Sequence, residues 1–331
     1  MLEGVLKMKA VILTKPTESR EIKITEYPTP AVKPGLVLVR IKSFGMNHSE
    51  QILRKSEISA PYIQKPIIPG IECVGEIADA SDTALTAGQK VIALMGGMGR
   101  EFNGSYAEYA LLPAHHVFTA DTNLSWNQLA AIPETYFTAW GSLFECLSLK
   151  SSDHLLVRGG TCALGYAAIQ IAKAFGCKVT ATTHRESKMQ LLTDCGADTV
   201  LLDNGSLKGQ VSGITKALEL VGIKTLKNTL SCMEKGGIVC NTGNLGDIYT
   251  WNGFDPIKDI PNGIYLTGFF SNTPTQETIN DIFAFLDAHN LTPHIGKCYL
   301  FTDIAKACED MENGKINGKI VIDVNGGGLN A

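Results

Sequence analysis

The stretch of the chain with the clearest chemical meaning is LLVRGGTCALGYAAIQIAKAFG, residues 155–176. A strand pattern runs directly into a tight turn of small residues, Gly159 to Ala163, and a helix pattern begins near Gly165. Backbone N–H groups at a helix N-terminus carry partial positive charge and can hold a pyrophosphate, while small residues let phosphate approach the backbone. The full Gly-x-Gly-x-x-Gly pattern is not met, so tight packing alone is the alternative interpretation.

The end of the next strand indicates which nucleotide would bind. The strand KVTATT ends at Thr183, His184 and Arg185 follow, and Lys188 comes one turn later. Sheets that bind NAD usually carry Asp or Glu here, which accepts hydrogen bonds from the ribose hydroxyls. Arg185 and Lys188 can instead pair with a 2′-phosphate, and Thr183 can donate a hydrogen bond to it. This favours NADPH over NADH; the alternative is that both cations are solvated charges at a helix start.

The elements that must position these residues fall into two groups. A chain of 331 residues predicts two domains. The first 120 residues read as short strands with Gly and Pro turns, which is typical of a β-barrel. From about Leu124 strands alternate with helices, which predicts an α/β, doubly wound parallel sheet. The last 40 residues read as a return to the first domain, so we predict domains at 1–123, completed by 291–331, and at 124–290.

Composition excludes several classes of protein. The formal net charge is −4 (29 Lys and Arg, 33 Asp and Glu), which argues against nucleic acid as the main partner. The sequence contains no run of about 18 apolar residues, so no membrane span is predicted. The N-terminal segment lacks the features of a secretory leader. Nine scattered cysteines without a C-x-x-C pair fit reduced thiols. We therefore expect a cytoplasmic protein that does not bind membranes or nucleic acid.

Five segments, in order along the chain, resemble one family. They are PGIECVGEI at 69–77, GSYAEYALLPA at 104–114, TYFTAWGSLF at 135–144, the turn segment at 159–176 and NGKINGKIVIDV at 313–324. Together they resemble the medium-chain dehydrogenase/reductase superfamily, on its zinc-free quinone oxidoreductase side. The resemblance implies a GroES-like β-barrel catalytic domain, a Rossmann domain that binds NADPH, and a homodimer. The segment GIYLTGFF, 263–270, is a candidate edge strand for that dimer.

The resemblance also implies roles for individual residues. Asn47 matches an asparagine that faces the active site and cofactor in zinc-free members. The other implied cofactor contacts are Thr138; Gly160, Thr161, Cys162, Ala163 and Leu164 for the pyrophosphate; Thr183, Arg185 and Lys188 for the adenosine phosphate; and Thr242, Gly243, Phe269 and Phe270 near the nicotinamide. Cys162 and Ala163 stand where the family usually carries adjacent glycines, and the Cys162 side chain narrows the turn.

No metal site is predicted. Zinc-dependent relatives need a cysteine where this chain has Met46 or Asn47, and a histidine where it has Ile71. Methionine and isoleucine cannot supply the thiolate and imidazole that zinc needs. His48 and Glu50 remain nearby, but two weak ligands do not make a site, and a structural role for His48 is the simpler interpretation.

Without a Lewis acid, reduction is favoured over alcohol oxidation. We expect hydride transfer from NADPH to a small electrophile, a quinone, with Asn47 as hydrogen-bond donor to the developing oxygen. Tyr62 or Tyr136 is a candidate proton donor, although either can be a packing aromatic. An enoyl or 2-alkenal reductase is the alternative, because the substrate loops at 56–67 and 246–261 do not separate the two. A non-catalytic NADPH-binding protein is a third interpretation.

Overall fold

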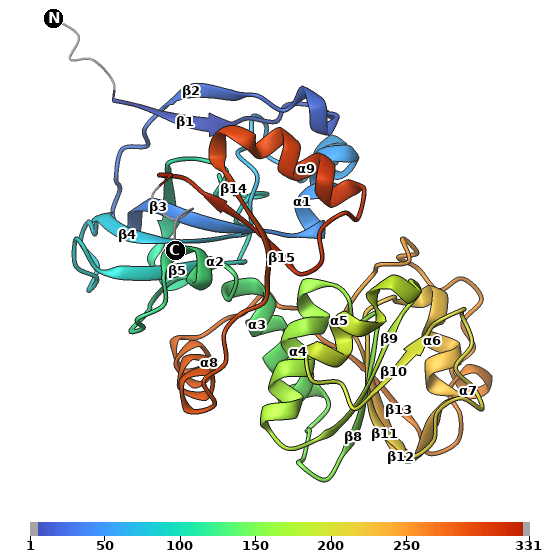
Figure 1. The fold of residues 1–331 in the computed structure, drawn as a ribbon. Helices are drawn as coiled ribbons and strands as arrows, with labels where there is room; N and C mark the ends of the chain where they lie inside the picture. Colours follow the sequence, from blue (N-terminus) through green and yellow to red (C-terminus); the bar gives the residue numbers. More distant parts are fainter. Residues whose placement is uncertain (1–5, 327–331) are drawn as a thin grey trace, which may run out of the picture. The chain divides into compact units, whose positions relative to one another are not determined.

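The structure is a computed structural model that describes residues 6–326, and it divides the chain into two compact units. The first unit holds the chain up to Glu134 and again from Asn272 onward (Figure 1). The second unit is the segment Thr135–Ser271. Helix α8 (Gln276–Ala288), which the sequence interpretation assigned to a domain at 124–290, belongs to the first unit. There the Gln276 side chain accepts from the N–H of Thr119 at 2.8 Å and donates to its carbonyl at 3.1 Å.

The first unit is the expected strand-rich, GroES-like domain. Its main sheet has the order β14-β15-β3-β4-β5-β7, with β6 also paired to β3. These strands are β3 (Leu36–Met46), β4 (Glu72–Asp79), β5 (Lys90–Leu94), β6 (Tyr109–Pro113), β7 (Val117–Thr119), β14 (Ile295–Leu300) and β15 (Lys319–Asp323). A two-stranded sheet of β1 (Lys7–Val11) and β2 (Ile24–Pro28) and the helices α1 (His48–Lys55), α2 (Trp126–Ala130) and α9 (Ile304–Glu312) complete the unit.

Strand β3 organises this unit. Val37, Val39 and Ile41 are fully buried because alternate residues of a strand point to the same face of the sheet. On one edge β3 pairs antiparallel with β15, with Met46 opposite Ile320 and Ser43 opposite Asp323. Residues nearly 280 positions apart in sequence are therefore neighbours, and the red C-terminal segment lies with the blue N-terminal strands in Figure 1.

The second unit is the expected doubly wound sheet. Its six strands are all parallel, in the order β10-β9-β8-β11-β12-β13. The strands are β8 (His154–Arg158), β9 (Lys178–Thr183), β10 (Thr199–Leu202), β11 (Ile214–Glu219), β12 (Met233–Asn241) and β13 (Tyr265–Gly268). The helices are α3 (Pro133–Trp140), whose first two residues fall in the first unit, α4 (Ala163–Ala174), α5 (Met189–Asp194), α6 (Ile223–Leu230) and α7 (Pro256–Asp259).

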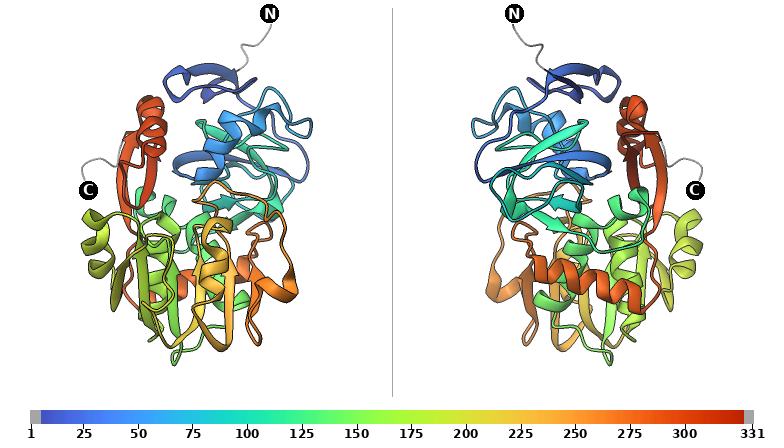
Figure 2. Two further views of the ribbon diagram at one scale, coloured as in Figure 1. Left: turned by 90° about the vertical axis from the view of Figure 1, so that its right-hand side faces the viewer. Right: turned by 90° about the vertical axis from the view of Figure 1, so that its left-hand side faces the viewer.

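The order of the strands reverses between β8 and β11. Figure 1 shows α4 and α5 on one face of the sheet and α6 on the other, and the turned views in Figure 2 show the strands lying side by side. Ligands of such sheets bind beyond the carboxyl ends of the strands at the point of reversal. The residues after β8 and β11 are therefore the expected location of a ligand-binding site.

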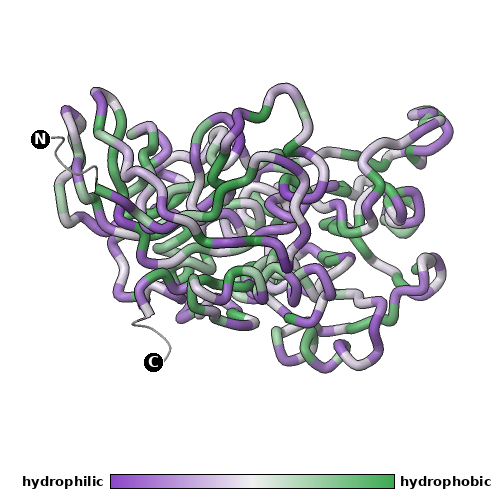
Figure 3. The backbone as a smooth tube through the Cα atoms, turned by 90° about the horizontal axis from the view of Figure 1, so that it is seen from above, coloured by the Kyte–Doolittle hydropathy of each residue, from purple (hydrophilic) through white to green (hydrophobic). Residues whose placement is uncertain are grey.

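Hydrophobic residues are distributed as in a packed domain. Figure 3 shows them alternating with hydrophilic residues along most of the trace. Across residues 6–326, none of the helices combines the length and the apolar character that a membrane span requires.

A buried ion pair ties the distant parts of the first unit together. Lys319 of β15 and Glu72 of β4 are both inaccessible to solvent, and the Lys319 Nζ lies 2.6 Å from the Glu72 Oε1. Lys319 also donates to the Asn47 Oδ1 at 2.7 Å, and the Asn47 amide donates to the Glu72 Oε1 at 2.7 Å. Gly45 leaves the space for this pair, since a Cβ there would lie 2.5 Å from the Glu72 carboxylate.

A second buried carboxylate lies beside the pair. Glu50 accepts the backbone N–H of Asn47 at 2.7 Å and that of Ile71 at 3.1 Å. Burial, and then the charge of Glu72, raise the pKa of Glu50 to about 7, while Lys319 and the backbone donors act in the opposite direction. One lysine thus serves two buried carboxylates.

Glu50 should make the stability of the protein depend on pH. Its pKa in the folded chain exceeds the ordinary value of 4.5, so the folded state binds this proton more tightly than the unfolded state. The free energy of unfolding should therefore fall as pH rises from about 4.5 to about 7, by on the order of 3 kcal/mol for this group.

The measurement is chemical unfolding from pH 5 to pH 8 for the wild type and Glu50→Gln, whose amide oxygen can still accept a hydrogen bond. The variant should lose much of the fall in stability, and Glu21→Gln, at an exposed position, should retain it. Equal pH dependence in the wild type and Glu50→Gln would contradict the raised pKa.

Candidate functional site

The turn after β8 is built by hydrogen bonds to the neighbouring strand β9. The N–H of Gly159 donates to the Thr182 hydroxyl at 3.1 Å, and that of Gly160 donates to the Thr182 carbonyl at 2.8 Å. Gly159 has φ +86°, a conformation that favours glycine. The Cys162 thiol caps α4 by accepting the N–H of Gly165 at 3.3 Å. Cys162 therefore occupies the N-cap position.

Close packing explains one glycine of this turn. A Cβ on Gly165 would lie 2.4 Å from the carbonyl oxygen of Gly160, so α4 rests directly on the turn. Ala163 and Leu164 begin the helix, where backbone N–H groups have no acceptor within the helix. Thr161, Ala163 and Leu164 thus lie where a helix N-terminus can hold a pyrophosphate.

Positively charged side chains gather after β9. Burial lowers the pKa of His184, and the charges of Arg185, Lys188 and Lys224 lower it further, with Asp203 opposing them. Burial and then Arg185 likewise lower the pKa of Lys188. The Arg185 Nε donates to the His184 Nε2 at 3.2 Å. We call the three cations Arg185, Lys188 and Lys224, together with the His184 imidazole whose pKa they lower, the cationic cluster.

The cationic cluster contains one residue that sequence reasoning missed. Lys224 stands at the start of α6, after the strand β11, about 40 residues from Arg185. The sequence feature that could have identified Lys224 is its position at the start of a helix that follows a parallel strand. Thr183, at the end of β9, is buried, and its hydroxyl accepts the N–H of Arg185 at 3.2 Å. Thr183 therefore helps to set the course of the chain at this cluster.

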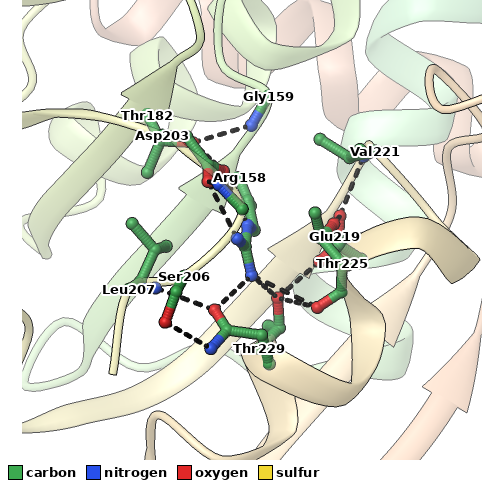
Figure 4. Close-up of polar contacts among 12 residues, drawn as sticks. Arg158, Gly159, Thr182, Asp203, Ser206, Leu207, Glu219, Val221, Thr225 and Thr229 are labelled. Atoms are coloured by element: carbon green, nitrogen blue, oxygen red, sulfur yellow. Dashed lines mark hydrogen bonds and ion pairs between the residues drawn. The ribbon is translucent and has the colours of Figure 1, made fainter. Parts of the chain in front are cut away.

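Beneath the turn lies a buried arginine that sequence reasoning also missed. Arg158, the last residue of β8, is fully buried and holds both oxygens of Asp203, through Nε at 2.7 Å and Nη2 at 2.9 Å (Figure 4). Its Nη1 donates to Asn228 and Thr229 of α6, both at 2.9 Å. This arginine joins the ends of β8 and β10 to α6. The only sequence feature that could have identified Arg158 is that a charged residue ends an otherwise apolar strand.

Glu219 performs the same task at the end of β11. One oxygen accepts the N–H groups of Val221 and Gly222 at 2.8 and 3.0 Å and the Thr225 hydroxyl at 3.0 Å (Figure 4). Burial raises the pKa of Glu219 despite these donors and the nearby Arg158. This carboxylate fixes the loop between β11 and α6, and thereby the start of α6, where Lys224 lies.

The residues expected near a nicotinamide follow β12 and β13. The Thr242 hydroxyl lies 3.0 Å from that of Ser142, and a Cβ on Gly243 would meet the carbonyl oxygen of Leu220 at 2.3 Å. The ring of Phe269 packs against Phe137, with centroids 5.8 Å apart, whereas Phe270 is 77% exposed. Thr138 is buried on α3. All belong to the second unit.

The candidate proton donors have different surroundings. Tyr62 is 64% exposed, and its hydroxyl donates to Glu57 at 3.1 Å. Tyr136 is buried, donates to the Gln170 side chain at 2.6 Å, and burial raises its pKa. A buried hydroxyl already bound to an amide favours the packing interpretation for Tyr136.

Asn47 stands at the N-cap of α1, inside the ion-pair network of the first unit. One amide hydrogen is held by Glu72 at 2.7 Å, whereas the contact to the Glu50 Oε1 is long, at 3.5 Å. A bond of that length is weak, so the second hydrogen is the one that can donate elsewhere.

The side chains here do not fit a catalytic zinc ion. Met46 or Asn47, and Ile71, stand where the resemblance implies thiolate and imidazole ligands in zinc-dependent relatives, and Lys319 places a cation against Glu72. Within residues 6–326 no group of three or more His, Cys, Asp or Glu side chains is arranged to hold a metal ion.

Two family models match separate stretches of the chain. The model described as "Alcohol dehydrogenase GroES-like domain" matches residues 33–122, and the model described as "Zinc-binding dehydrogenase" matches residues 163–288. Three solved structures share the fold: AibC (25% identity, TM-score 0.85, 96% of each chain), an NAD-dependent alcohol dehydrogenase (24%, 0.84, 96% and 100%) and mycobacterial Rv1454c complexed with NADPH (22%, 0.82, 96% and 100%).

Curated relatives extend over nearly the whole chain. Quinone oxidoreductase of Homo sapiens is 29% identical over 315 residues, covering 90% of this chain and 92% of the relative. An alcohol dehydrogenase of Geobacillus stearothermophilus is 26% identical over 348 residues, covering 95% and 98%. The two family models, which together match residues 33–122 and 163–288, place the chain among the medium-chain dehydrogenases/reductases, a family of nicotinamide-dependent oxidoreductases, and its curated relatives include quinone oxidoreductases.

Proposed function

We propose that this protein is a zinc-free, NADPH-dependent reductase of quinones. The observation that carries the cofactor preference is the cationic cluster after β9, since the residues that end this strand, Thr183 to Arg185, include no carboxylate that could accept from ribose hydroxyls. A 2′-phosphate would receive charge-assisted bonds from Arg185 and Lys188 there. Among the structural neighbours, Rv1454c is described as complexed with NADPH.

Each group of residues has a separate task in this proposal. The turn residues Gly160 to Leu164 would hold the pyrophosphate, and Thr138, Thr242, Gly243, Phe269 and Phe270 would border the nicotinamide, which supplies a hydride when bound. Asn47 would donate its loosely held amide hydrogen to the oxygen that gains negative charge during reduction. Exposed Tyr62 is the better placed of the two tyrosines for proton exchange with solvent.

One assay tests both whether turnover needs zinc and which electrophiles the protein reduces with NADPH. Purified protein treated with a chelator should oxidise NADPH with a panel of ortho- and para-quinones at an unchanged rate, followed at 340 nm. Faster turnover of 2-alkenals than of any quinone would replace the proposed substrate class by an α,β-unsaturated carbonyl. Loss of turnover on chelation, with recovery on adding zinc, would contradict the zinc-free mechanism.

The cationic cluster should discriminate between the two nicotinamide nucleotides. Replacing Arg185 with Ala removes a charged hydrogen bond worth about 1.5–3 kcal/mol, so the Kd for NADPH should rise about 10- to 160-fold while that for NADH stays nearly constant. Fluorescence titration measures both constants. Lys178→Ala, at the opposite end of β9, is the matched control and should leave both unchanged. An equal loss of affinity for both nucleotides would contradict the role given to Arg185.

Asn47 should affect turnover rather than cofactor binding. Asn47→Ala removes a donor to the developing oxygen, so kcat should fall by roughly a hundredfold. The Kd for NADPH should stay close to that of the wild type. Because Asn47 also accepts from Lys319, thermal unfolding of the variant is measured alongside. A folded Asn47→Ala variant with normal kcat would remove Asn47 from the mechanism.

We further propose a cytoplasmic homodimer whose subunits pair through β13. This strand is an edge of its sheet, and Tyr265 on it is 61% exposed. An exposed edge presents unpaired backbone groups that a second copy can bind.

A further inference from the structure

One arginine of the first unit joins three segments of the chain near Asn47. Arg100 lies between β5 and β6, and its guanidinium holds both carboxylate oxygens of Glu57, through Nε at 2.9 Å and Nη2 at 2.8 Å. The two side chains are 22% and 17% exposed. Two parallel bonds of this kind fix both groups in one plane. The Arg100–Glu57 pair therefore holds the Glu57 carboxylate in one orientation.

The same guanidinium contacts the start of α1. The Arg100 Nη2 also donates to the Ser49 hydroxyl at 2.9 Å and to the Ser49 carbonyl at 3.2 Å. Ser49 is the second residue of the helix whose N-cap is Asn47. Arg100 is thus bound to the helical turn that begins at the proposed hydrogen-bond donor.

Glu57 in turn holds the hydroxyl of Tyr62. The Tyr62 hydroxyl donates at 3.1 Å to the Glu57 Oε1, the same oxygen that accepts from the Arg100 Nε. Glu57 begins the short 3-10 helix Glu57–Ser59, and Tyr62 follows in the loop after it. Hydrogen bonds therefore connect α1 to the hydroxyl of Tyr62 through the Arg100–Glu57 pair.

The backbone of this loop has a second support. Ile58 and Ile63, on either side of the loop's exposed part, are buried in one apolar cluster with Leu53 of α1. This packing does not involve the guanidinium. A change at Arg100 should therefore release the Tyr62 side chain without unfolding the loop that carries it.

We propose that Arg100 is a positioning residue, which orients Glu57 so that the Tyr62 hydroxyl is held where it gives its proton to the substrate. This inference rests on the proposed function. In that reaction the nicotinamide supplies a hydride to the quinone, and Tyr62 gives a proton to the oxygen that gains negative charge. The exposed tyrosinate that remains takes a proton from water, which restores the hydroxyl.

Arg100 also balances the charge that this step creates. A tyrosinate formed beside the Glu57 carboxylate would meet a like charge, which disfavours loss of the proton. The guanidinium paired with Glu57 supplies the compensating positive charge. Position and charge therefore both depend on one side chain, and a substitution that keeps the charge can separate them.

Arg100→Lys keeps the positive charge, but an ammonium group cannot hold both Glu57 oxygens in a planar fork. Because a misplaced catalytic group loses much of its effect, kcat with a quinone should fall roughly tenfold or more. KM and the Kd for NADPH should stay close to those of the wild type, since the proton moves only during the chemical step. Lys42→Ala is the matched control. It breaks an ion pair to Glu76 in which the lysine is 21% exposed, and it should leave kcat unchanged.

A double-mutant cycle with Tyr62→Phe tests whether Arg100 acts through the hydroxyl. Phenylalanine keeps the ring and removes the group that Glu57 holds. In the Tyr62→Phe background, Arg100→Lys should lower kcat no further, because both substitutions remove the same interaction. Losses that multiply in the double variant would overturn the proposal, as would a normal kcat in Arg100→Lys.

A spectroscopic measurement separates this proposal from the proposed function. In protein with ¹³C-labelled tyrosine, the Tyr62 ring signal is assigned by its absence in Tyr62→Phe. It should shift in Arg100→Lys and keep its position in Lys42→Ala. An unshifted signal in Arg100→Lys would overturn the positioning role. A shifted signal in a protein whose wild type reduces no quinone or 2-alkenal would instead contradict the proposed function.

Discussion

The first unit depends on the ion pair between Lys319 and Glu72. Both groups are removed from water, so each needs the other, and removal of one partner of such a pair typically destabilises a protein by about 3–5 kcal/mol. The pair also fixes Asn47, because the lysine and the carboxylate hold the two ends of its amide. The position and the hydrogen bonds of the proposed catalytic amide are thus set by a contact between two residues that are 247 positions apart in sequence.

The second unit uses buried charge in a different way. Arg158 and Glu219 end two adjacent parallel strands, and neither faces solvent. Their partners lie in the loops and helix that follow the sheet, so the ends of the strands are held in place by polar contacts rather than by apolar packing. In the proposed function the surface above the sheet accepts a charged nucleotide, and fixed internal polar groups would let that surface be both polar and ordered.

Local patterns predicted much of this structure. The parallel sheet followed from strands alternating with helices, and the turn at Gly159 from its small residues, because both depend on short stretches of chain. The assignment of α8 to the first unit could not be predicted from the sequence, since a helical pattern does not show which unit the helix packs against. Arg158, Lys224 and the pairing of Lys319 with Glu72 were missed because their partners lie 45, 40 and 247 residues away. The roles of Asn47, Thr242 and the cationic cluster toward a ligand remain predictions.

The discontinuity of the first unit has a consequence for the order in which the protein forms. During synthesis the whole of Thr135–Ser271 emerges before the segment that contains Lys319. Domains fold as units as they leave the ribosome, so the second unit has all its strands while the first unit still lacks β14 and β15. Until residue 319 arrives, Glu50 and Glu72 have no lysine, and β3 has an open edge where β15 will pair. The nascent chain therefore passes through a stage with one complete unit and one exposed sheet edge, which is the stage at which a chaperone would be needed most.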